Sequence, residues 1–406
     1  MKKILIGLII GGILITSCRL MKNEVPFEPT PIEKELIDAF NKFGIKLFKE
    51  INEIETEESN IFISPLSVSM ALGMAYNGAR DSTERAMQNV LEFGELSRME
   101  INESYRHLYD VLTGLDESVI FEIANSIWYE RSFNVKDSFI GINRKYFDAE
   151  VSALDFSDPS SVDIINNWVK EKTHNKIERI VDRISPDEVM FLINAIYFKG
   201  IWTYKFDEDA TQEGYFYLQD GGRRLCEFME QTIPCDYFEN DEFQAVSLPY
   251  GRELFRMMII LPKPGIELDA IISSFTMDEW VTWIEEFKEC SVNVIIPKFK
   301  FKYENRLDSV LTNLGMGIAF TPEADFSGIS EANPRISRVL HKTFVQVDEE
   351  GTEAAAVTAV GFGFVSPSPI GIVFRADHPF LFVIYESYSN TILFIGKLVD
   401  PVWEDE

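Results

Sequence analysis

The chain has 406 residues, 46% of them hydrophobic, and a formal net charge of −28. That length supplies one large domain or two of ordinary size, with ample apolar material for a core. The acidic balance argues against nucleic acid as a partner, because binding nucleic acid needs a basic face, and it gives the protein a well-solvated surface.

Residues 1–17 have the pattern of an export signal. Lys2 and Lys3 precede the apolar run Ile4–Ile15, which is shorter than the about 20 residues that span a membrane. The run Leu-Ile-Thr-Ser before Cys18 resembles the lipobox of bacterial lipoproteins, in which the cysteine is lipidated and the peptide is cut just before it. An ordinary signal peptide followed by a chance cysteine is the alternative.

We therefore expect an exported protein, attached by the lipid on Cys18 to the periplasmic or extracellular face of a bacterial cell membrane. Two or three acyl chains on one residue anchor stably, because each buried CH₂ contributes about 0.8 kcal/mol. Residues 18–30 contain prolines and few core residues, which predicts a flexible tether. Loss of Lys2 and Lys3 with the leader would change the net charge from −28 to −30.

Helices are predicted first along the remaining chain. Apolar residues recur every three or four positions over residues 32–55, which indicates one amphipathic helix. Ser64 is a candidate N-cap, and Pro65 suits the first turn of a helix that continues to Tyr76. Further helices are predicted over residues 79–91 and 162–173.

Strands are predicted from about residue 118 onward. Residues 119–129 are apolar and β-branched, and residues 189–198 form a near-continuous apolar run, typical of a strand buried on both faces. Later strands are expected at residues 245–249, 256–261, 291–297, 339–348, 379–386 and 391–398. Helices and strands interleave without a βαβ period and without a linker, so we expect a single α+β domain over residues 31–406 with antiparallel or mixed sheets.

One segment fits neither a core element nor an ordinary turn. Residues 349–371 begin with small side chains, continue with interrupting glycines and end in serines and prolines. A loop of this length in a compact domain is usually functional.

Motifs for catalysis are missing from the sequence. The chain has no GxSxG, HExxH, CxxC, GxxxxGK or GxGxxG pattern. Its four histidines are single and scattered, and carboxylate pairs carry little information in so acidic a chain: His107, His174, His341 and His378. An enzyme therefore has no positive support, and we expect no cofactor and no metal.

Three cysteines remain after Cys18. Cys226, Cys235 and Cys290 are an odd number, so they cannot form a complete disulfide framework. Cys226 and Cys235 could pair in an oxidising compartment. Buried free thiols are the favoured interpretation.

Four separated blocks resemble the serpin family, and the resemblance covers about residues 33–401. The blocks are NIFISPLS at 60–67, NAIYFKGIW at 194–202, VQVDEEGTEAAA at 345–356 and FRADHPFLF at 374–382. The resemblance implies an α+β fold with three β-sheets, about nine helices and an exposed reactive-centre loop at about 349–372. It also implies a suicide-substrate inhibitor: a protease attacks the loop, an acyl-enzyme forms, and the cut loop enters the central sheet as a further strand.

The start of this loop has the composition that insertion requires. By the resemblance the hinge comprises Glu350, Gly351, Thr352, Glu353, Ala354, Ala355 and Ala356. Small side chains slip between strands, and the absence of proline keeps the ladder donors. Alternation would point the side chains of Thr352, Ala354, Ala356, Thr358 and Val360 toward the core, and would leave those of Glu353 and Val357 on the outer face.

The resemblance also assigns residues to two control points. The shutter, a hydrogen-bonded cluster beneath the opening sheet, would comprise Ser64, Ser67, Asn194 and His341. The breach, where the loop first enters, would comprise Trp202, Lys298 and Glu349, with an ion pair between the last two.

The family register places the scissile bond at Val365–Ser366, which suits an elastase-like serine protease. A shift by one residue gives Phe364–Val365, a chymotrypsin-like site, and Pro367 favours that shift. Phe364 would also suit papain-like cysteine proteases, whereas the absence of Lys and Arg between Glu349 and Phe374 argues against trypsin-like enzymes.

We therefore expect a monomeric inhibitor that forms covalent complexes with serine, or cysteine, proteases. A non-inhibitory serpin that binds or carries a ligand is the alternative, and a hydrolase is a distant third.

Overall fold

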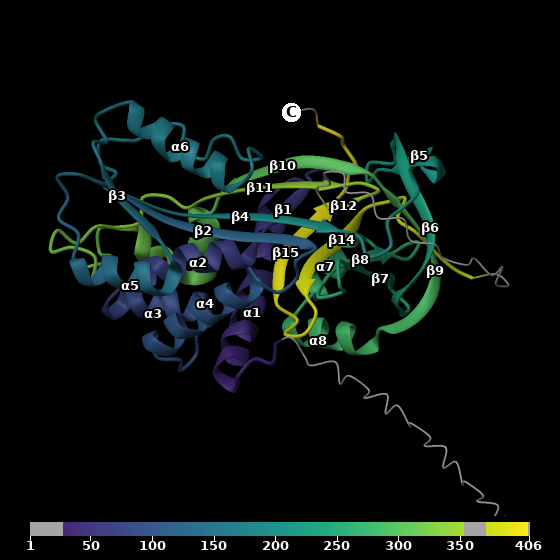
Figure 1. The fold of residues 1–406 in the computed structure, drawn as a ribbon, viewed down its shortest axis with the longest axis horizontal. Helices are drawn as coiled ribbons and strands as arrows, with labels where there is room; N and C mark the ends of the chain where they lie inside the picture. The colour runs from purple at the N-terminus through teal and green to yellow at the C-terminus, as the bar shows by residue number, and fades with distance from the viewer. Residues whose placement is uncertain (1–26, 353–370, 405–406) are drawn as a thin grey trace, which may run out of the picture.

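The computed structural model describes residues 27–352 and 371–404 (Figure 1). These residues form nine α-helices: α1 Pro31–Ile54, α2 Pro65–Tyr76, α3 Asp81–Val90, α4 Arg98–Leu112, α5 Asp137–Phe147, α6 Ser160–Lys172, α7 Leu268–Ser274, α8 Met277–Glu286 and α9 Asp308–Leu311. Within the described ranges, no helix has both the length and the apolar character that crossing a membrane requires.

The helix starts follow from local hydrogen bonding. The hydroxyl of Ser64 accepts a bond from the amide of Ser67, so the predicted N-cap of α2 is confirmed. Thr30 and Glu33 form a reciprocal capping box at α1. The helix predicted over residues 79–91 is α3, which begins two residues later at Asp81.

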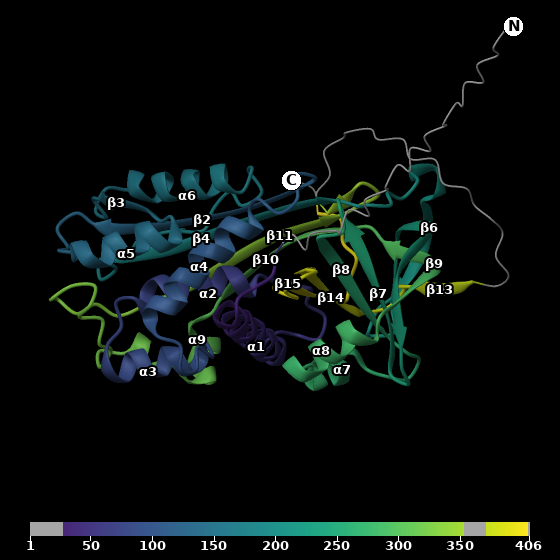
Figure 2. The same cartoon turned by 60° about the horizontal axis from the view of Figure 1, so that its bottom comes forward.

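The central sheet has six strands in the order β10-β11-β12-β4-β2-β3. Their bounds are β10 Phe299–Arg306, β11 Leu340–Val347, β12 Gly351–Thr352, β4 Met190–Ile201, β2 Val119–Glu130 and β3 Glu150–Leu154. In Figure 2 this sheet lies between α6 on one face and the helices α1 to α5 on the other.

A second layer holds the remaining nine strands, in the order β1-β15-β14-β8-β7-β6-β9-β13 with β5 beside β6. Their bounds are β1 Ile61–Ile63, β5 Gln212–Tyr217, β6 Arg223–Glu239, β7 Phe243–Tyr250, β8 Phe255–Pro262, β9 Lys288–Pro297, β13 Ile372–Arg375, β14 Phe380–Glu386 and β15 Ile392–Leu398. The α+β prediction is confirmed. The 17-residue strand β6 pairs with β9 along most of its length and with β7 at its end, and thereby joins the other two expected sheets into one hydrogen-bonded layer.

Strand β4 confirms the prediction of burial on both faces. Phe191 and Ile193 pack into a cluster under α6, whereas Ile196 and Phe198 pack into the main core. Adjacent side chains of a strand point to opposite faces, so a near-continuous apolar run is what such a position requires.

One expectation needs correction, and one alternative is excluded. The predicted tether extends too far, because Phe27 is only 5% exposed and packs edge-on against His107 with ring centroids 5.8 Å apart. Cys226 and Cys235 do not pair: both lie on β6, nine residues and roughly 30 Å apart along an extended strand. The three cysteines of the described residues are free, as the favoured interpretation predicted, but only Cys235 is fully buried.

Candidate functional site

Strand β12 is the feature around which the site is built. Its two residues lie between β4 and β11, with Thr352 opposite Gly200 on one side and Val347 on the other. Gly351 cannot be replaced here, because a Cβ on it would lie 2.0 Å from the carbonyl oxygen of Gly200. After the turn that follows β11, the chain therefore enters the central sheet for two residues.

Trp202 and Tyr250 hold β12 in place. The indole of Trp202 donates to the carbonyl oxygen of Asp348 at 3.0 Å, and its backbone amide donates to that of Glu350 at 2.9 Å. Its ring stacks on Tyr250, with centroids 4.3 Å apart. The hydroxyls of Tyr250 and Thr352 hydrogen-bond at 2.5 Å, so the first core-facing side chain of the hinge is already buried and satisfied.

Charged groups surround the same segment. The predicted ion pair is present, with Lys298 Nζ 3.2 Å from Glu349 and 3.1 Å from Glu227. Burial opposes the charge of Glu349, but a hydrogen bond from Thr211 and the nearby Lys298 leave its pKa below the ordinary value. Lys205 pairs with Glu350. We call Trp202, Tyr250, Lys298 and residues 348–352 together the upper site.

The predicted shutter residues are brought only partly together. The amide of Ser64 donates to Nε2 of His341 at 3.1 Å, and the hydroxyl of Ser64 donates to the carbonyl oxygen of Leu393 at 2.8 Å. Burial lowers the pKa of His341 to about 4, so the ring is neutral at pH 7. Asn194 bonds instead to Asn125, at 2.8 Å, and its buried Oδ1 has no protein partner among the described residues.

Below Thr352 the central sheet is open. Strands β4 and β11 each pair with β12, but among the described strands no ladder joins them directly. A small cavity of about 20 Å³ lies just beneath β12, between Tyr197 and Phe198 on one side and Thr343 and Phe344 on the other.

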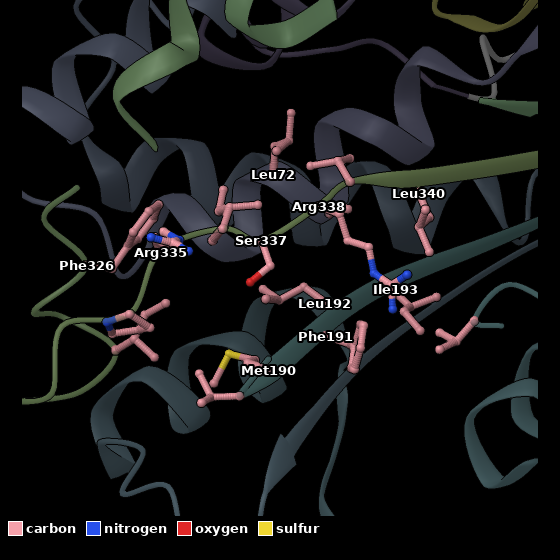
Figure 3. Close-up of a pocket in the computed structure, with 18 of the residues that line it drawn as sticks. Leu72, Met190, Phe191, Leu192, Ile193, Phe326, Arg335, Ser337, Arg338 and Leu340 are labelled. Atoms are coloured by element: carbon pink, nitrogen blue, oxygen red, sulfur yellow. The ribbon is translucent and has the colours of Figure 1, made fainter. Parts of the chain in front are cut away.

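A second cavity, of about 80 Å³ and with a mainly apolar lining, lies at the far end of this gap. Figure 3 shows part of its lining: Leu72 from α2, Met190 to Ile193 from β4, and Ser337, Arg338 and Leu340 from the segment that leads into β11. We call it the lower cavity. It is bordered by a buried ion pair, in which Arg338 lies 2.7 Å from Glu188 and also donates to the carbonyl oxygen of Arg183 at 2.7 Å.

The chain rejoins the structure in the second layer. Strand β13 pairs in parallel with β9, with Ile372 opposite Val292. Most of the hinge, Glu353 to Ala356, and the candidate scissile residues Phe364, Val365 and Ser366 lie outside the described residues.

Several residues of the site were not predicted from the sequence. Tyr250, Lys205 and Thr211 surround the upper site, and Arg338 with Glu188 borders the lower cavity. Only Tyr250 could have been selected from the sequence, because it is an aromatic residue next to Gly251, at a turn. The others are ordinary polar residues in a chain that has many.

These features describe a central sheet with room for one more strand between β4 and β11, where Gly351 and Thr352 occupy the upper end. A family model described as Serpin (serine protease inhibitor) matches residues 38–401. The chain belongs to the serpin family. Serpins are generally protease inhibitors rather than catalysts.

Similar proteins span nearly the whole length. Iripin-2 of Ixodes ricinus is 34% identical over 375 residues, which cover 90% of this chain and 94% of the relative. Native tengpin, a thermophilic serpin, superposes with a TM-score of 0.83 at 34% identity, over 92% of this chain and 96% of that one. Human thyroxine-binding globulin in complex with thyroxine gives a TM-score of 0.84 at 26% identity, over 91% and 100%.

Proposed function

We propose that this chain inhibits serine endopeptidases as a suicide substrate, by inserting its cleaved loop between β4 and β11. The observation that carries the proposal is that Gly351 and Thr352 already occupy the top of that slot, in register with both neighbours. The chain then acts as a covalent trap and has no catalytic turnover of its own.

The register of β12 supports continued insertion. Each further residue would advance one position along both antiparallel neighbours. Counted from Thr352, the residue Thr358 would then lie opposite Asn194 on β4 and His341 on β11. Its hydroxyl could donate a hydrogen bond to the unpartnered Oδ1 of Asn194. That bond would stabilise the inserted state relative to the open shutter.

The free energy of insertion can be sized. About a dozen new ladder hydrogen bonds, each contributing roughly 0.5–1.5 kcal/mol, give on the order of 10 kcal/mol. Filling the lower cavity with residues after Thr358 adds burial of apolar surface. The sum is comparable to the stability of a whole domain, so the uncut protein would be metastable.

The target follows from the residues of the loop. A bond at Val365–Ser366 favours elastase-like enzymes, and one at Phe364–Val365 favours chymotrypsin-like enzymes, with papain-like cysteine proteases as further targets. Export and lipidation at Cys18 would present the inhibitor as a monomer on the periplasmic or extracellular face of a bacterial cell membrane.

A non-inhibitory carrier is the second candidate. The similarity to thyroxine-binding globulin in complex with thyroxine favours it, since that serpin binds a small molecule. Against it, the side chains from Ala354 to Ala359 are uncharged and mostly small, as insertion into the sheet requires.

The deciding experiment combines three readouts on one sample. The full chain is incubated with an elastase-like, a chymotrypsin-like and a papain-like protease. We expect an SDS-resistant complex with the first or second, a cut after Val365 or Phe364 by mass spectrometry, and a rise of more than about 10 °C in the melting temperature of the cut protein. A cut loop with fully active protease and unchanged melting temperature would overturn the inhibitor and leave the carrier.

A further inference from the structure

Two of the free cysteines lie directly opposite each other. In the antiparallel pairing of β6 with β9, Cys235 is the Cα partner of Cys290. Cα atoms of paired residues in such a ladder are about 4.5 or 5.5 Å apart, depending on the type of pair. Both distances fall within the range of about 4.4–6.8 Å that a disulfide bridges.

The two side chains also share a face of the sheet. Ile233 and Val292, paired two positions away, are both buried, and Cys235 follows the same alternation at 3% exposure. Cys290, nearer the end of β9, is partly exposed. The strand pairing therefore places the two cysteine side chains next to each other on one face of the sheet.

We propose that Cys235 and Cys290 form a cross-strand disulfide when the protein meets an oxidising disulfide, either a small molecule or a protein. The thiolate of Cys290 attacks the oxidant, and one thiol leaves. The sulfur of Cys235 loses its proton to water, attacks the mixed disulfide at Cys290 and releases the second thiol. Two protein thiols are oxidised and one disulfide is reduced to two thiols, so electrons and protons balance.

The order of the steps follows from exposure. Cys290 is reachable from solvent, whereas burial raises the pKa of the Cys235 thiol to about 12. Asp236 raises that pKa further, and Arg256 lowers it. Closure by Cys235 is therefore the slow step, and the mixed disulfide at Cys290 precedes it.

The disulfide would link β9 covalently to β6, next to the place where β9 pairs with β13. Cys290 lies two residues before Val292, which pairs with Ile372 at the start of β13. A link from β9 to β6 at this point holds the support of β13 fixed, whether or not the loop is cut. The proposal does not rest on the inhibitory function.

Cys226 provides a built-in control. It lies on the same strand as Cys235 but opposite Gly214, so it has no cysteine to meet across its ladder. The full chain is treated with oxidised glutathione, alkylated and digested. We expect a linked peptide pair that contains Cys235 and Cys290, an alkylated Cys226, and a melting temperature higher by on the order of 5 °C than in the reduced sample.

Two variants keep the result interpretable. Cys226→Ser should retain the linked peptides and the thermal gain, and Cys290→Ser should lose both while it remains folded in its reduced form. If folded wild-type protein keeps both Cys235 and Cys290 alkylatable, or if glutathione stays on Cys290 without closure, the proposal is overturned.

Discussion

The two ends of the gap between β4 and β11 differ in kind. At the upper site every contact is specific: β12 pairs with both strands, Trp202 bonds two carbonyl groups, and Tyr250 satisfies Thr352. The lower cavity is lined mainly by apolar side chains and is bordered by the ion pair of Arg338 with the buried Glu188. Under the proposed function, the upper site would determine whether a strand enters, and the lower cavity would determine how much free energy its insertion releases.

The largest expected effect comes from blocking the upper site. Thr352 is 4% exposed, and Thr352→Arg would place a long charged side chain between β4 and β11. Burying an unpaired charge costs several kcal/mol, so we expect the yield of SDS-resistant protease complex to fall on the order of 100-fold while the loop is still cut. Gel densitometry of complex against cleaved inhibitor measures this ratio.

The control is a threonine outside the gap. Thr282 is exposed on α8, and Thr282→Arg should leave complex formation unchanged. Because Thr352→Arg can expel the hinge into solvent, its melting temperature before cleavage should stay near that of wild type. Equal complex yields from the two variants would show that β12 is not the point at which insertion begins.

The ion pair at the lower cavity should give the largest change in native stability. Arg338→Met leaves Glu188, 5% exposed, without its cation. Breaking a buried pair costs about 3–5 kcal/mol, and we expect a loss near the lower value because Arg338 is partly exposed. Denaturant unfolding measures it.

The matched variant removes both charges. Arg338→Met with Glu188→Leu should recover most of the loss, since the lower cavity is otherwise apolar. A double variant as unstable as the single one would mean that Arg338 acts through its bond to the carbonyl group of Arg183 rather than through Glu188.

His341, midway along the gap, should make stability depend on pH. Its folded pKa is about 4, against an ordinary value of 6.5, so the unfolded chain takes up a proton between these values and the folded protein does not. The contribution of His341 to the free energy of unfolding is therefore fully present above pH 6.5, and it falls by roughly 3 kcal/mol as the pH drops to 4. His341→Gln keeps an acceptor for Ser64 and should flatten that part of the profile.

Much of the fold could be predicted from local pattern. Ser64 with Pro65 marked the start of α2, and the apolar run in β4 indicated burial on both faces. Helix α4 was missed although Ser97 and Glu100 form a capping box. Strand β6 was missed because it contains Pro234 and many charges, which its long pairing with β9 overrides.

The site was less predictable, because its partners are far apart in sequence. The ion pair of Lys298 with Glu349 was expected from the family resemblance and is present. Arg338 and Glu188 lie 150 residues apart, and no local rule selects them from the many charges of the chain. The bond of Asn194 to Asn125 depends on the register of β2 with β4, which the sequence alone does not specify.

The smallest effect is expected from filling the lower cavity. Ala71 lies on α2 and lines that cavity, so Ala71→Leu would bury further apolar surface without loss of helix propensity. We expect a gain of about 1 kcal/mol in native stability. The same side chain would occupy volume that the inserted strand needs, so the fraction of protease trapped should fall as the fraction of loop cut without trapping rises.

The control variant is Ala79→Leu. Ala79 is fully buried outside the cavity, and overpacking there should cost about 1–3 kcal/mol. If the Ala71→Leu variant is more stable but traps protease as well as wild type, the inserted loop does not occupy the lower cavity.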